Sequence, residues 1–128
     1  MNYIDVVAVI SVLQLIFFSV LVGRARGQYG VTAPAVVGHE LFERAYRVQM
    51  NTLELLVAFL PALFIAGKYW PQPAIAGLGA VYVLGRFIYW RAYMGAPKSR
   101  GLGFGLSIFP ILLLLVAALV GALSRGAP

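Results

Sequence analysis

The chain has 128 residues, of which 62% are hydrophobic and only 11% are charged, and its formal net charge is +6. A soluble domain of this length needs more polar surface than this composition supplies, so we expect a protein embedded in a membrane. The basic residues are scattered around hydrophobic runs, which argues against nucleic acid as a partner. Cysteine is absent, and this excludes a disulfide, a thiolate metal site and a cysteine nucleophile.

Four hydrophobic segments have the length of about 20 residues that a bilayer core requires. They are residues 5–22, 51–70, 73–93 and 102–123. They predict a single all-α domain over residues 1–128, folded as a bundle of four transmembrane helices. No basic residue precedes the first segment, so we expect it to remain as a helix and not to act as a cleaved signal. Pro61 and Pro110 lie inside their segments and are expected to kink those helices.

The connections between these segments differ in character. Residues 23–40 contain several glycines and a proline, which predicts an irregular segment that could act as a lid over a site. Pro71 and Pro73 predict a tight second turn. Basic residues concentrate at the first and third connections, so we expect those loops to face the cytoplasm and both termini to face away from it. The short chain favours a bacterial inner membrane.

Charged and amide side chains are dense in residues 38–54, directly before the second hydrophobic segment. Ionisable groups inside a membrane are costly unless they have partners. At about 100° per residue, Arg44, Arg47, Asn51 and Glu54 fall within an arc of roughly 80° and form one polar stripe. Gln49 falls roughly opposite this stripe, so the helix should contact protein in two directions. An oligomer buries two such faces more readily than a monomer.

The third hydrophobic segment has a stripe of its own. Tyr82, Arg86, Tyr89 and Tyr93 follow one another at spacings of four, three and four residues, which places them on one helical face. One interpretation is an aromatic belt at the membrane surface, with Arg86 neutralising Glu54. The other is that the tyrosines form one wall of a binding site.

Polar residues from both stripes and from the third connection should gather at one depth. They are Arg47, Gln49, Asn51, Glu54, Tyr89, Tyr93 and Arg100. Arginine binds carboxylates through paired donors, a carboxylate can receive an ammonium group, and an asparagine can satisfy a peptide group. Such a site suits a small zwitterionic peptide, although spacing alone does not name it.

Two separate patterns resemble one known family. Residues 38–51 read G-x-x-x-F-E-R-A-Y-x-x-Q-x-N, and residues 86–93 read R-x-x-Y-x-x-x-Y, with Arg100 seven residues later. Both are similar to the MAPEG family, the membrane-associated proteins of eicosanoid and glutathione metabolism. They are most similar to its branch of leukotriene C4 synthase and microsomal glutathione transferase. The resemblance covers essentially the whole chain.

This resemblance implies a homotrimer with glutathione bound in each cleft between neighbouring subunits. The implied glutathione contacts from one subunit are Arg47, Asn51, Glu54, Tyr89 and Tyr93. Gln49 and Arg26 would reach the same glutathione from the next subunit, and Arg100 would be the catalytic residue that activates the thiol. Glutathione would be the co-substrate, no metal is implied, and the second substrate would be a lipophilic electrophile or a lipid hydroperoxide.

The chain also departs from the family pattern. Leu55 stands where the synthase branch has a tyrosine beside the glutamate, and the proline of the second helix is displaced to Pro61. These differences make specific leukotriene synthesis poorly supported. Three smaller departures, Ala45, Val48 and Thr52, leave the polar stripe intact.

Two other functions remain open. A non-catalytic member of the same family would bind lipid or glutathione without turning it over. A small four-span transporter would use Glu54 to exchange protons for cations, but the neighbouring arginines would repel a cation.

Several polar residues have simpler interpretations than a role in a site. We expect Arg44 and Glu43 to form a structural ion pair and His39 to lie on the surface. Gln14 is expected to hold two helices together within the membrane. Arg24 and Lys98 are most simply determinants of membrane orientation, with contact to lipid phosphate as a second role.

Overall fold

The computed structural model describes residues 1–125 as four long helices and one short one. The elements are α1 (Tyr3–Tyr29), α2 (Glu40–Tyr69), α3 (Gln72–Gly95), the 3₁₀ helix η1 (Pro97–Ser99) and α4 (Gly101–Ser124). Each long helix is long and apolar enough to cross a bilayer. The four predicted segments therefore correspond one by one to these helices.

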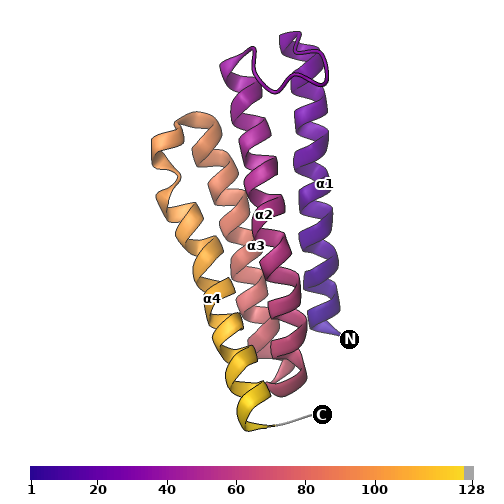
Figure 1. Ribbon diagram of the computed structural model, residues 1–128, viewed down its shortest axis with the longest axis vertical. Helices are drawn as coiled ribbons and strands as arrows, with labels where there is room; N and C mark the ends of the chain where they lie inside the picture. Colours follow the sequence, from indigo (N-terminus) through magenta and orange to yellow (C-terminus); the bar gives the residue numbers. More distant parts are fainter. Residues whose placement is uncertain (126–128) are drawn as a thin grey trace.

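The long helices run alternately up and down, so α1 begins and α4 ends at the same end of the bundle (Figure 1). Helices α2 and α3 each pack against the other three long helices, with α1 and α4 on either side of them. At the centre, the rings of Phe59 and Tyr82 stack with their centroids 3.9 Å apart, and both side chains are fully buried. Many large apolar side chains point outward instead, such as Val57 at 70% exposure, as expected of helices surrounded by lipid.

Local signals account for the helix ends. The Asn2 side chain accepts a hydrogen bond from the backbone N–H of Asp5 and so caps α1. His39 caps α2 in the same way, because its Nδ1 accepts from the backbone N–H of Leu41 at 3.1 Å. Helix α1 ends at Gly30, whose φ of 69° is the left-handed conformation that favours glycine at this position.

The first connection is shorter than the sequence predicts. Residues 23–29 belong to α1, so the irregular segment covers residues 30–39 and not residues 23–40. Gly23 and Gly27 lower helix propensity, yet α1 continues through both, and Val22 and Ala25 on its packed face are buried. The tight turn between α2 and α3 is confirmed, and both α2 and α4 continue through Pro61 and Pro110.

Candidate functional site

A cleft of about 420 Å³ opens between α2, α3 and the beginning of α4. Its lining residues are Arg47, Asn51, Tyr89, Tyr93, Arg100 and Phe104. Five of these six come from the sequence-predicted set, although about 40 residues separate the pair on α2 from the pair on α3. The polar stripes of the second and third helices therefore face each other.

Helical spacing explains how each element presents its residues. Arg47 and Asn51 are four residues apart on α2, and Tyr89 and Tyr93 are four apart on α3, so each pair shares one helical face. Arg100 lies between η1 and α4, and its Nη1 donates to the carbonyl oxygen of Pro97 at 3.0 Å. The short helix η1 thus brings the third-connection arginine back over the cleft.

Arg86 is fully buried beneath this cleft and binds α2 to α3. Its Nη2 donates to Asn51 Oδ1 at 2.7 Å and to Thr52 Oγ1 at 3.0 Å, and its Nε donates to the same Thr52 oxygen at 3.2 Å. The predicted neutralisation of Glu54 by Arg86 is not what the structure contains. Thr52 and Asn51 accept from the guanidinium instead, because Arg86 lies level with these residues and Glu54 points outward.

The partner of Arg86 determines how Asn51 is oriented. A guanidinium only donates hydrogen bonds, so the atom of the Asn51 amide that faces it must be the oxygen. The amide nitrogen of Asn51, with its two N–H groups, is then left available to a ligand. Asn51 therefore offers donors to the cleft in a fixed orientation.

Aromatic stacking continues this arrangement along α3. The guanidinium of Arg86 lies 4.3 Å from the centroid of the Tyr89 ring, and the Tyr89 and Tyr93 rings stack at 5.5 Å. This column of Arg86, Tyr89 and Tyr93 holds the tyrosine side chains in place and leads from the buried core to the cleft.

Three predicted residues do not line the cleft in a single chain. Glu54 lies on α2 one turn beyond Asn51 and is exposed. Gln49 faces α1, where its Nε2 donates to Ser19 Oγ at 2.9 Å. Arg26 is in the last turn of α1, and its Nη1 donates to the carbonyl oxygen of Ala35 at 2.7 Å. A single subunit therefore assembles only part of the predicted set.

The ion pair at the beginning of α2 involves a different glutamate from the predicted one. Arg44 pairs with Glu40, one helical turn earlier, while Glu43 accepts from the backbone N–H of Gly38 at 3.0 Å. Arg44 also donates to the carbonyl oxygen of Met94 at 2.8 Å, which ties α2 to the end of α3. Its role is structural, as expected, and so is that of the exposed His39.

Phe104 and Thr52 belong to the site or its support and were not predicted from the sequence. Phe104 lies one turn after Arg100 on α4, so the spacing of the two residues could have indicated a shared face. Thr52 carries no comparable signal, because a single threonine next to an asparagine is common in helices. Its importance depends on Arg86 lying opposite it.

The charges of the cleft favour an anionic ligand. Within residues 1–125, the one ion pair is that between Arg44 and Glu40, so the cleft arginines Arg47 and Arg100 have no carboxylate partner there. Two free guanidinium groups, an oriented amide and two tyrosines can together receive carboxylates and peptide carbonyl groups.

Comparison with known proteins identifies similar chains. Residues 4–120 match the sequence model of the MAPEG family. Human microsomal glutathione S-transferase 2 is 42% identical over 115 residues, which cover 90% of this chain and 78% of that protein. Leukotriene C4 synthase of Cavia porcellus is 35% identical over 122 residues, covering 95% of this chain and 81% of that protein. An uncharacterized protein of Synechocystis is 44% identical over 119 residues, covering 91% of this chain and 87% of that protein.

Proposed function

This chain belongs to the MAPEG family, and we propose that it is a membrane-embedded glutathione transferase that acts on lipophilic electrophiles. The observation that carries the proposal is the cleft between α2, α3 and α4, in which Arg47 and Arg100 have no carboxylate partner among residues 1–125 and Asn51 presents amide donors. The four apolar helices, together with the family, make the chain an integral, multi-pass membrane protein.

Glutathione fits the chemistry of these residues. It carries two carboxylates, one ammonium group, two peptide groups and a thiol. In our proposal Arg47 binds a carboxylate, Asn51 donates to a peptide carbonyl, and Glu54 receives the ammonium group. Tyr89 and Tyr93 contribute hydroxyl groups on a rigid stacked wall.

The proposed catalytic group is Arg100. A free thiol has a pKa near ~8.5, and a guanidinium within hydrogen-bond reach favours the thiolate, which is the nucleophile. The thiol proton leaves to solvent. The thiolate then forms a carbon–sulfur bond while the bond from that carbon to its leaving group breaks, and the leaving group departs with the electron pair. Arg100 stays protonated throughout and is not consumed. Reduction of a lipid hydroperoxide, with a second glutathione consumed, would use the same thiolate.

We further propose that the site is completed in a homotrimer. Glu54 lies in the middle of α2 and is exposed in a single chain, where lipid would surround it unless a neighbouring subunit or a ligand covers it. Gln49 extends from α2 toward α1, and Arg26 is in the last turn of α1. Both therefore lie away from the cleft of their own chain. In a trimer they would reach the glutathione of the adjacent subunit.

The orientation in the membrane is also a proposal. Arg24 and Arg26 lie near the end of α1, beside the first connection, and Lys98 and Arg100 lie in the third connection. Both loops would therefore face the cytoplasm, and both termini would face the opposite side. The cleft opens at this cytoplasmic end, where glutathione is available. A bacterial inner membrane remains the preferred location.

The test compares the wild type with Arg100→Ala in detergent. We expect the wild type to conjugate glutathione to an aryl halide and to be stabilised by glutathione against thermal unfolding. Arg100→Ala should lose most of its turnover and keep the stabilisation. Lys98→Ala is the matched control, because Lys98 lies in η1, two residues away, and does not line the cleft. This control should keep both properties.

Each contrary result removes a specific part of the proposal. A wild type that glutathione does not stabilise would refute the binding site. Full turnover in Arg100→Ala would refute the role of Arg100. Stabilisation by glutathione without turnover in any condition would identify a non-catalytic binding protein of the same family, which is the alternative function.

A further inference from the structure

A second cavity, of about 540 Å³, opens between α1, α2 and α3 on the other side of the bundle from the cleft. The polar and sulfur-containing residues that line it are Arg24, Gln28, Tyr29, Trp90, Arg91 and Met94. It shares no lining residue with the cleft described above. On α3, Arg91 lines the second cavity and Tyr89 lines the cleft; on α2, Ala45 lines the second cavity and Arg47 lines the cleft. Each pair is two residues apart, which is a rotation of about 200° around the helix, so the two openings face different directions.

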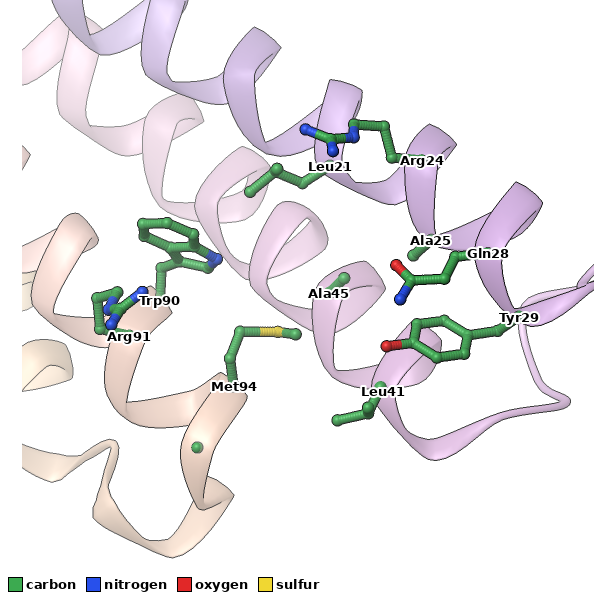
Figure 2. Close-up of a pocket in the computed structure, with 11 residues that line it drawn as sticks. Leu21, Arg24, Ala25, Gln28, Tyr29, Leu41, Ala45, Trp90, Arg91 and Met94 are labelled. Carbon is green, nitrogen blue, oxygen red and sulfur yellow. The ribbon is translucent and has the colours of Figure 1, made fainter.

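The polar groups of this cavity are suited to an anion. Figure 2 shows Gln28 and Tyr29 reaching from α1 toward Met94 of α3, with Arg24 beside Leu21 on α1 and Arg91 beside Trp90 on α3 at two separate edges of this group. Within the part of the chain that the structure describes, the side chains of Arg24, Gln28 and Arg91 form no hydrogen bond, and no carboxylate lines the cavity. The guanidinium of Arg91 lies 5.5 Å from the centroid of the Trp90 ring. Two cations and further donors with no internal acceptor are positioned to bind a ligand that supplies acceptors and negative charge.

Aromatic side chains of α1 and α3 continue from the cavity toward the centre of the membrane. Phe17 of α1 lies with its ring centroid 5.5 Å from that of Trp90 and 6.4 Å from that of Phe87, both on α3. Phe17 and Phe87 are 40% and 37% exposed, so their rings form part of the outer surface between the two helices. A ligand that occupies both regions has a charged head and an apolar tail.

The depth of the cavity agrees with a lipid. Arg24 lies just beyond the predicted first hydrophobic segment, and Arg91 lies in the last turns of α3. Both arginines are therefore at the level of the phospholipid headgroups, where tryptophans such as Trp90 are also enriched. We propose that this cavity binds an anionic phospholipid, with its phosphodiester between Arg24 and Arg91 and an acyl chain along Phe17 and Phe87.

The proposal can be tested with the fluorescence of Trp90. The chain has two tryptophans, and Trp70 is at the opposite end of the bundle, so Trp70→Phe leaves Trp90 as the single reporter. This protein is reconstituted into bilayers of brominated phosphatidylcholine, which quenches an adjacent tryptophan. Unlabelled phosphatidylglycerol is then titrated in, and in a parallel series unlabelled phosphatidylcholine. We expect phosphatidylglycerol to restore fluorescence at lower mole fractions than phosphatidylcholine does.

The expected preference can be estimated from the two arginines. A basic residue near an anionic membrane surface contributes about fivefold in lipid affinity at moderate ionic strength, so each of Arg24→Gln and Arg91→Gln should lower the preference by about that factor. The double variant should show almost none. Lys98→Gln is the matched control, because it removes one exposed cation from the same end of the bundle but outside the cavity.

Several outcomes would overturn the proposal. Equal recovery with the two unlabelled lipids would show that the cavity does not select an anionic headgroup. An equal loss of preference in Lys98→Gln and in the cavity variants would assign the effect to overall surface charge. Inorganic phosphate that abolishes the preference at millimolar concentration would identify a site for a soluble anion and not for a lipid. Both arginines are exposed, so the variants should fold normally, and circular dichroism checks this.

Discussion

Replacing Arg86 by methionine should weaken glutathione binding although Arg86 does not line the cleft. The substitution removes the hydrogen bonds to Asn51 and Thr52, each worth about 1.5–3 kcal/mol when the donor is charged. It also removes a buried charge, which recovers several kcal/mol of desolvation. We expect a net destabilisation of about 1–3 kcal/mol, which is the usual range for a substitution in a buried network.

The effect on the ligand follows from Asn51. Without Arg86, the Asn51 amide is free to rotate, and fixing it again on binding costs about 0.5–1.5 kcal/mol, which raises the Kd for glutathione by about two- to tenfold. The turnover number at saturating glutathione should stay within about twofold of the wild type, because Arg86 does not contact the cleft in which Arg100 would act on the thiol.

Isothermal titration of glutathione into the detergent-solubilised protein measures the Kd, and conjugation kinetics give kcat and KM separately. Arg91→Met is the matched control, since Arg91 is an exposed arginine on the same helix. Arg86→Lys keeps the charge but not the branched set of donors, so its Kd should lie between those of the wild type and Arg86→Met. The reasoning is refuted if Arg86→Met raises the Kd no more than Arg91→Met does.

Two further predictions concern helix packing. A Cβ at Gly103 would clash with the backbone of Tyr89. Gly103→Ala should therefore separate α4 from α3 and lower the free energy of unfolding by about 1–3 kcal/mol. Gly105→Ala is the control and should leave the free energy of unfolding unchanged, because a Cβ there has no neighbour within 4 Å. Thermal unfolding of both variants measures this, and equal unfolding temperatures would contradict it. Gln14→Leu removes a hydrogen bond of 2.9 Å to the carbonyl oxygen of Val83, and steric trapping in bicelles should register a loss of only about 0.6 kcal/mol.

The sequence was sufficient to predict the fold because hydrophobic length is a direct consequence of bilayer thickness. It was not sufficient for the boundary of α1. Gly23 and Gly27 suggested an irregular segment, yet the helix ends only at Gly30, where the backbone adopts a positive φ. The presence of a glycine alone does not show whether a helix continues or ends there. The outcome depends on whether that glycine adopts a helical or a left-handed backbone conformation.

The cleft was predictable to the extent that each helix is periodic. Spacing correctly placed Arg47 with Asn51, and Tyr89 with Tyr93, since each pair depends on one helix alone. The partner of Arg86 depends on how far α2 and α3 are shifted relative to each other along the bundle axis. The residue spacing within one helix carries no information about that shift. A carboxylate was the obvious partner for a buried arginine, but the structure supplies an amide and a hydroxyl.

Gln49 shows where a single chain stops being sufficient to define the site. Its position opposite the polar stripe predicted a second protein contact, and in one chain that contact is Ser19 of α1, through one hydrogen bond of 2.9 Å. The amide oxygen of Gln49 and the second amide hydrogen can still bind another group. On α2, the exposed Arg47 and Glu54 face another direction and have no ion-pair partner within residues 1–125. Charged groups in the membrane need partners, so the surface that carries Arg47 and Glu54 is the one that a neighbouring subunit and its ligand should cover.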